Sequence, residues 1–375
     1  MARKNLRISP FEGIGLAASE SSDISIVENK FMFLGTLASL ESAIVKPKVI
    51  KVQTGEELVK SVIEIIENEK SNIRLAIMVS ASLIPGLLPV FDKYYGKNIN
   101  GPKPSASISL TVAIESFGSS ALKSTGVLSF ADAGYTVISP STAQECFDYT
   151  QIANITASII GAPVISYFDS DNLNFGAWFL ANTTGPSKCI TESFKKNRED
   201  FLKYNGDSSI SRSQEMELIM KSYYRSSTTS YIGSPFAETV FVSISDYDIG
   251  VWLDNTSIGY LRIHVYSPLP TDAIIASLPK TVKRVVILEQ ESGLSEFHGH
   301  LFRDFQDIFK SQAFTDKIES APLVTEVQST YSIPIILSHP PYFFQFMENI
   351  APLNVSSLVR LDQVLGFPDK ETIEY

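Results

Sequence analysis

The residues from 134 to 169 constrain the fold of this chain more than any other stretch. An apolar segment around Val137 and Ile138 has the composition of a short strand, and the turn at 139–142 carries hydroxyls that can cap a helix. Apolar residues then recur every three or four positions as far as Ile160, and Gly161-Ala162-Pro163 ends the helix.

A second strand is expected directly after this helix, from Val164 to Phe168. It is apolar nearly throughout, as a parallel strand that is covered on both faces must be. It ends at Asp169, and α/β proteins usually bind ligands at the carboxyl ends of such strands. The stretch therefore predicts a strand-helix-strand unit within an α/β fold of mostly parallel sheets.

Length and charge exclude several classes of protein. With 375 residues, of which 44% are hydrophobic and 19% charged, the chain is long enough for two domains with cores of their own. A net charge of -10 without a dense block of Lys and Arg argues against nucleic acid as a partner. The longest apolar run, Ile73 to Ile84, is interrupted by Arg74, Ser80 and Ser82, so we expect no contact with a membrane.

The first residues and the cysteines indicate the compartment. Residues 1–7 are basic and lack the apolar stretch of a secretory signal, so a cytoplasmic protein is expected. Cys146 and Cys189 are too few for a disulfide framework or a four-cysteine metal site, and both are expected to be buried thiols. The sequons at Asn154, Asn182, Asn255 and Asn354 are therefore expected to carry no glycan.

Changes in composition predict two α/β domains, at 1–204 and 233–345, with a polar linker at 205–232 and a tail at 346–375. In the first domain, Thr54 to Glu57 has the spacing of a capping box before a helix. The other expected elements are a strand at 75–79, a helical segment at 83–91, a short helix at 215–224 in the linker, strands at 239–244, 259–266, 285–289 and 333–337, a helix at 272–278 and a helix after Glu296.

Four motifs have both a functional and a structural interpretation. Gly13-Ile14-Gly15 matches a loose dinucleotide fingerprint, but the residues before it make a poor strand, so we expect no nucleotide there. His298 and His300 beside Glu296 have the donor types of a metal site but are more typical of a polar helix edge. Cys146 is expected in the core rather than as a nucleophile. Asp169 and Asp171 have the oxygen ligands that suit Mg²⁺, although a solvated loop explains them equally well.

Several longer passages resemble the amino-terminal half of pyruvate:ferredoxin oxidoreductases. They are the opening stretch at 134–169, Tyr231 to Glu238, Arg262 to Pro268, and Leu278 to Glu289. The resemblance implies two three-layer α/β domains: first the pyrimidine-binding domain for thiamine diphosphate, then a transketolase-C-like domain.

The chain departs from that family where the chemistry is expected. The family places a glutamate, which hydrogen-bonds the aminopyrimidine ring, in a passage whose match here is Gln53 to Glu56, and its position is taken by Gly55. Glu56 comes one residue later, and one residue turns a helical side chain by about 100°. No basic residue occurs between Lys103 and Lys123 to clamp a substrate carboxylate, the loop after Asp169 differs, and the Gly-Asp-Gly motif and cluster cysteines are missing.

These departures imply a vestigial pocket near Gly55 and Asp169, with no catalytic residue, no metal site and no cofactor bound by this chain. Degenerate domains of this kind resemble the amino-terminal part of the NADPH flavoprotein subunit of fungal assimilatory sulfite reductases, in which FAD and NADPH bind to further modules. The first hypothesis is therefore a non-catalytic region for folding or subunit contacts in sulfate assimilation, with a sirohaem sulfite reductase subunit as partner.

Two alternatives remain open. One is a working subunit of a thiamine-diphosphate-dependent 2-oxoacid:ferredoxin oxidoreductase that a partner chain completes. The other is a free-standing binding protein that keeps the old pocket for a different ligand.

Overall fold

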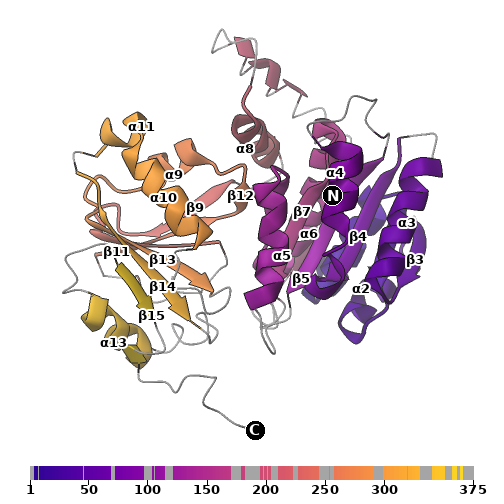
Figure 1. Ribbon diagram of the computed structural model, residues 1–375, viewed down its shortest axis with the longest axis horizontal. Helices are drawn as coiled ribbons and strands as arrows, with labels where there is room; N and C mark the ends of the chain where they lie inside the picture. Colours follow the sequence, from indigo (N-terminus) through magenta and orange to yellow (C-terminus); the bar gives the residue numbers. More distant parts are fainter. Residues whose placement is uncertain are drawn as a thin grey trace. The chain divides into compact units, whose positions relative to one another are not determined.

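A computed structural model (Figure 1) shows two compact units, residues 1–227 with 265–269, and residues 228–264 with 270–375. The structure describes residues 4–6, 8–44, 46–68, 72–96, 104, 106–114, 121–169, 179–181, 195–196, 198–200, 202–203, 210–222, 227–244, 253, 257–290, 299–318, 320–329, 340–350, 357–360 and 364–365. Within these residues, no helix combines the length and the apolar character needed to cross a membrane.

The first unit is built on a seven-stranded sheet with the strand order β12-β6-β7-β5-β4-β2-β3. All of its strand pairs are parallel except the pair of β12 with β6. The strands are β2 (Ile24–Glu28), β3 (Lys48–Val52), β4 (Arg74–Ser80), β5 (Ser107–Ile114), β6 (Thr136–Ile138), β7 (Val164–Asp169) and β12 (Val265–Ser267). A separate antiparallel pair joins β1 (Lys4–Leu6) to β8 (Phe179–Ala181).

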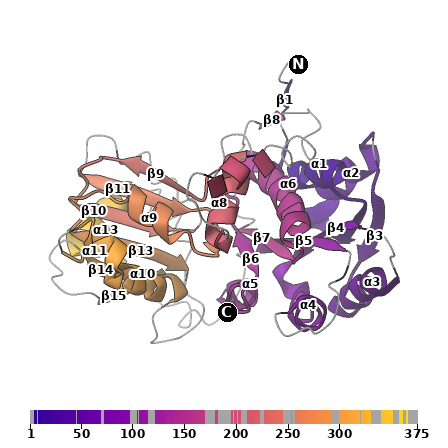
Figure 2. The ribbon, with the colours of Figure 1, turned by 90° about the horizontal axis from the view of Figure 1, so that it is seen from above.

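Helices cover both faces of this sheet (Figure 2). On one face lie α1 (Pro10–Ser21), α2 (Leu34–Ser42), which follows the short helix η1 (Phe31–Phe33), and α6 (Ala143–Ile160). On the other face lie α3 (Gly55–Asn68), α4 (Leu87–Tyr95) and α5 (Ala121–Asp132). The short helix η2 (Ala81–Leu83) precedes α4, and α8 (Arg212–Ser222) packs its methionines against α6.

The expected strand-helix-strand unit is present as β6, α6 and β7. The hydroxyl of Thr142 accepts the Glu145 N–H at 3.1 Å and so caps α6 at its start. Gly161 ends the helix with φ of 61°, a left-handed conformation that glycine adopts without steric cost. The strands β6 and β7 are parallel neighbours, as the apolar composition of both predicts.

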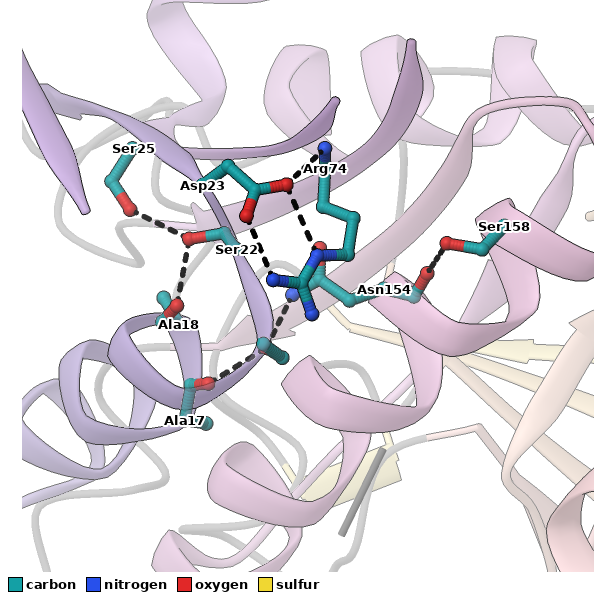
Figure 3. A network of polar contacts seen from close by, with 9 residues as sticks. Ala17, Ala18, Ser22, Asp23, Ser25, Arg74, Asn154 and Ser158 are labelled. Atoms are coloured by element: carbon teal, nitrogen blue, oxygen red, sulfur yellow. Dashed lines mark hydrogen bonds and ion pairs between the residues drawn. The ribbon is translucent and has the colours of Figure 1, made fainter. Parts of the chain in front are cut away.

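A buried polar network ties α1, α6 and β5 together near the amino ends of the strands, and Figure 3 shows the part of it around Asn154. Asn154 on α6 accepts the Ser109 hydroxyl at 2.7 Å and donates to the Ser21 hydroxyl at 2.8 Å. Beside it, Arg74 forms a bidentate ion pair with Asp23, with the closest contact at 2.8 Å. A buried polar group that loses its hydrogen bond is costly. This network therefore stabilises one position of α1 and α6 on the sheet.

The second unit contains a six-stranded sheet with the order β15-β14-β13-β10-β11-β9, in which only β9 is antiparallel to its neighbour. Figure 1 shows α9, α10 and α11 on one face and α13 on the other. Its elements are β9 (Thr229–Gly233), β10 (Thr239–Ser243), β11 (Ile258–Ile263), α9 (Thr271–Ser277), β13 (Arg284–Gln290), α10 (His300–Lys310), α11 (Gln312–Thr315), β14 (Leu323–Ser329), α13 (Pro340–Ile350) and β15 (Ser357–Arg360).

Two sequence predictions need correction. The single strand expected at 259–266 is two strands, because the chain leaves the second sheet after Ile263, which pairs with Thr229, and Val265 pairs instead with Ile138 of the first sheet. The helix expected at 83–91 begins only at Leu87, since Pro85 and Gly86 interrupt it. The strand expected at 333–337 lies outside the described residues.

Candidate site at the carboxyl edge of the first sheet

The parallel strands of the first unit end on one shared edge, and loops at such an edge bind ligands in α/β proteins. Glu28 ends β2, Val52 ends β3 and Ser80 ends β4. Asp169 ends β7, although its side chain is not among those described. Gly55 and Asp169, which the sequence analysis assigned to a vestigial pocket, both lie at this edge.

Glu28 is the buried carboxylate of this edge. Its side chain is 5% exposed, and one carboxylate oxygen, Oε2, accepts the backbone N–H of Ser80 at 2.6 Å. The last backbone pair between β2 and β4 joins Val27 to Met78, so the Glu28 carboxylate extends the hydrogen-bonding between these strands beyond their final pair. The structure describes no second hydrogen-bond partner for the carboxylate, and Oε1 is not among the buried side-chain atoms that lack a partner, so this oxygen is accessible to solvent.

Gly55 lies next to Glu28 along this edge. Glu28 faces Val52 across the β2–β3 pair, and Gly55 follows three residues later as the first residue of α3. A Cβ atom placed on Gly55 would meet only the Leu83 carbonyl oxygen, at an ordinary 3.5 Å. The position therefore has room for a side chain but supplies none.

The neighbouring glutamates of α3 do not fill this position. The expected capping box is present, because Glu57 N–H donates to the Thr54 hydroxyl at 3.2 Å and the Glu57 carboxylate accepts Gln53 N–H at 2.7 Å. Glu56 is exposed. Asp169 is not adjacent to Gly55 either. Three strands lie between β3 and β7, so the two strand ends are four inter-strand steps of about 4.8 Å apart, which is about 19 Å.

Two hydroxyls add polar groups at the end of β4. The Ser80 and Ser82 hydroxyl oxygens lie 2.8 Å apart, with Ser80 buried and Ser82 exposed. Together with the Glu28 carboxylate they make a small polar surface at the carboxyl ends of β2 and β4. Among the described residues, no group of three or more His, Cys, Asp or Glu side chains is arranged to hold a metal ion.

The glycines of the loose dinucleotide fingerprint lie within a helix rather than in a loop between a strand and a helix. Both Gly13 and Gly15 belong to α1, which starts at a capping box formed by Ser9 and Glu12. A Cβ atom on Gly15 would lie 2.5 Å from the carbonyl oxygen of Thr36 in α2. The glycines therefore allow α1 and α2 to pack closely against each other.

The other candidate site residues from the sequence that the structure describes lie in the core or in a helix. Cys146 is 1% exposed in the cluster with Ile14, Phe33 and Phe168, which confirms its expected place in the core. Asn154 of the first sequon is buried in the polar network. His300 begins α10. Glu296, His298, Asp171, Cys189 and the other three sequon asparagines lie outside the described residues.

Sequence reasoning missed Glu28, although the sequence contains the signal for it. Glu28 follows the apolar residues of β2 directly, in the same way that Asp169 follows those of β7. Applying the rule for strand ends to every apolar run, and not only to the longest strand-helix-strand unit, would have singled it out.

Comparison with known proteins identifies solved structures with a similar fold. No protein-family model matches the sequence, and no curated protein matches it. A 2-oxoglutarate:ferredoxin oxidoreductase from Magnetococcus marinus, solved with 2-oxoglutarate, coenzyme A and succinyl-CoA bound, aligns with 89% of this chain and 64% of its own at 11% identity and a TM-score of 0.55. A split-gene transketolase, described as an inactive beta4 tetramer, aligns with 89% of this chain and 93% of its own at 11% identity and a TM-score of 0.46.

At such low identity the first of these likenesses establishes the fold. The chain has the α/β architecture with mostly parallel sheets of thiamine-diphosphate-type oxidoreductases, as the sequence predicted, and it spans 64% of the length of the oxidoreductase chain. Neither neighbour is a sulfite reductase, so that finer resemblance stays a prediction.

Proposed function

We propose that this chain is a subunit of a thiamine-diphosphate-dependent 2-oxoacid:ferredoxin oxidoreductase that a partner chain completes. The observation that carries the proposal is the alignment of 89% of the chain with a 2-oxoglutarate:ferredoxin oxidoreductase. Thiamine diphosphate, when bound, supplies the carbanion chemistry of 2-oxoacid cleavage. Two cysteines cannot hold an iron–sulfur cluster, so the iron–sulfur clusters that transfer the electrons are expected in the partner chain.

The residues at the carboxyl edge fit this cofactor in one respect. A carboxylate is the group that an aminopyrimidine ring requires, and Glu28 offers one with a solvent-accessible oxygen. Neither the Gly-Asp-Gly diphosphate motif nor a basic clamp was found in the sequence, and the partner chain is expected to supply both.

The test is purification of the chain from its source cells under gentle conditions, with an affinity tag added to the chromosomal copy. We expect a stable complex that reduces a viologen dye when a 2-oxoacid and coenzyme A are added, and that loses this activity when thiamine diphosphate is removed. A complex without 2-oxoacid-dependent reduction in the presence of added cofactor and Mg²⁺ would contradict the proposal.

The absence of a side chain at Gly55 favours a second candidate. In that alternative the chain binds no cofactor and serves folding or subunit contacts in an NADPH-dependent sulfite reductase, whose FAD and NADPH modules lie elsewhere. The same purification separates the two candidates, because the second requires a sirohaem subunit and NADPH-dependent reduction of sulfite to sulfide in the recovered complex.

A further inference from the structure

We propose that the outer edge of β9 is an interface between two copies of this chain, which pair their β9 strands antiparallel across a twofold axis. β9 is the last strand of the second sheet, and no other described strand pairs with its outer side. Pairing of this kind joins the second sheets of the two copies into one. The proposal concerns the second unit alone and does not depend on the proposed function.

The hydrogen bonds at the two ends of β9 determine which of its backbone groups face outward. At one end, Ser234 N–H donates to the Ile258 carbonyl at 3.3 Å. At the other end, the Thr228 carbonyl accepts His264 N–H at 2.9 Å. In an antiparallel pair, residues that bond to the neighbouring strand alternate with residues that do not. The even-numbered residues of β9 therefore bond to β11, and the N–H and C=O of Tyr231, at the centre of the strand, point to the outer side.

A second copy can satisfy these outward groups of Tyr231. Across a twofold axis that passes beside Tyr231, the N–H of each copy donates to the carbonyl of the same residue in the other copy. The side chain is already fixed, because its hydroxyl donates to the Ser234 carbonyl at 2.6 Å and its ring lies where a Cβ atom on Gly259 would be. β9 is thus held in the sheet before a second copy binds, which lowers the entropic cost of pairing.

The charge of the chain favours contact between two copies at this stretch. Each copy carries a net charge of -10, so two copies repel each other on average. Residues 226–237 include no Asp, Glu, Lys or Arg, so the pairing of β9 brings no like charges together. The edge strand of the first sheet, β3, differs because Lys48 and Lys51 are exposed on it. Lysines on an edge strand prevent pairing with another chain, and β9 lacks this protection.

Two exposed apolar side chains lie beside the edge of β9. Ile232 is 53% exposed, and Phe236, in the turn after the strand, is 73% exposed. Ile232 lies opposite Tyr260 in the β9–β11 pair, so its side chain is on the face where Tyr260 packs with Phe343. In the paired sheet this apolar face continues from one copy to the other. The Ile232 side chains of the two copies become diagonal neighbours about 7 to 8 Å apart.

The test is the self-association of the purified chain, measured by sedimentation from nanomolar to high micromolar concentration. Two strands of five residues bury less surface than a stable dimer needs, so we expect a weak dimer with a micromolar dissociation constant. Ile232→Lys should weaken the dimer about tenfold, because the twofold axis makes two lysines diagonal neighbours. The variant should fold, since the replaced side chain is exposed and the backbone N–H still bonds to β11.

Leu34→Lys is the matched control. Leu34 is an apolar residue of α2 in the first unit and is 51% exposed, close to the exposure of Ile232. Both variants add the same charge and remove a side chain of the same size. We expect the dimer dissociation constant of Leu34→Lys to stay within about twofold of that of the unmodified chain, because the changed side chain lies outside the proposed interface.

Amide hydrogen exchange gives a second measurement that needs no variant. The Tyr231 N–H should exchange about fivefold more slowly at a protein concentration ten times the dissociation constant, because mass action leaves about a fifth of the chains monomeric there. The Ile232 N–H already bonds to β11, so its exchange should not depend on concentration.

The possible results separate the occupants of this edge. A chain that stays monomeric up to high micromolar concentration would overturn the proposal and leave the proposed function standing. A dimer that both lysine variants weaken equally, or that neither weakens, would assign the interface to another surface. If Ile232→Lys does not fold, unchanged exchange at Tyr231 in a dimerising chain would overturn the proposal. Slower exchange only in the complex from source cells would assign the edge to the partner chain instead.

Discussion

Replacing Gly15 with alanine tests how closely α1 and α2 are packed. The added Cβ atom would lie 2.5 Å from the Thr36 carbonyl oxygen and 2.9 Å from both the Thr36 Cα and the Ser39 Cβ. Two of these three atoms belong to the backbone of α2, which cannot rotate away as a side chain can. The Thr36 hydroxyl also donates to the Phe11 carbonyl at 2.8 Å, so separating the helices would weaken a second contact.

The size of the effect follows from two opposing contributions. Overpacking of a core costs about 1 to 3 kcal/mol, and contact with backbone places Gly15→Ala near the upper end. Alanine in place of glycine within a helix returns about 0.5 to 1 kcal/mol. The net expectation is a loss of about 2 kcal/mol in the free energy of unfolding of the first unit.

Gly126→Ala in α5 is the matched control. A Cβ atom there would meet the Ile84 Cδ1 at 3.5 Å, which is ordinary contact, so the variant should gain about 0.5 to 1 kcal/mol from helix propensity alone. At about 2 to 4 °C per kcal/mol, the two variants should differ in melting temperature by roughly 5 to 12 °C. Thermal unfolding followed by circular dichroism measures this difference. Equal melting temperatures for both variants would refute the close-packing argument.

Three further predictions concern other parts of the chain. Leu288→Ala should lower the urea midpoint of the second unit, by a free energy of about 3 to 5 kcal/mol, because Leu288 is 1% exposed in a core with Phe241 and Phe343; an unchanged midpoint would contradict this packing. Arg74 lowers the pKa of Asp23, so the stability lost in Asp23→Asn should be constant near neutral pH and disappear as the pH falls below about 3.9, the usual value for Asp. Solvent screening of this half-exposed pair limits that loss to less than about 1 kcal/mol; a loss that persists at the lowest pH would contradict the argument. Lys317→Met should speed amide hydrogen exchange in α9, because the ammonium donates to the carbonyls of Ala276 at 3.0 Å and Leu278 at 2.7 Å at the end of that helix; unchanged exchange would show that the helix end does not depend on it.

Local sequence signals predicted the elements whose cause is local. The capping box of Thr54 and Glu57, the cap at Thr142 and the glycine stop at Gly161 all depend on residues within four positions of one another. The strand from Val164 is apolar on both faces and was placed almost to the residue. The fold class followed from such units because a parallel strand-helix-strand unit has few ways to extend.

Features that depend on distant residues were not predicted. The network of Ser21, Ser109 and Asn154 joins three segments, and the hydroxyls of β5 are hidden within an otherwise apolar run. The return of Val265 to the first sheet depends on an edge that only the folded β6 provides. In both cases the partner is set by strand order, which composition and periodicity do not encode.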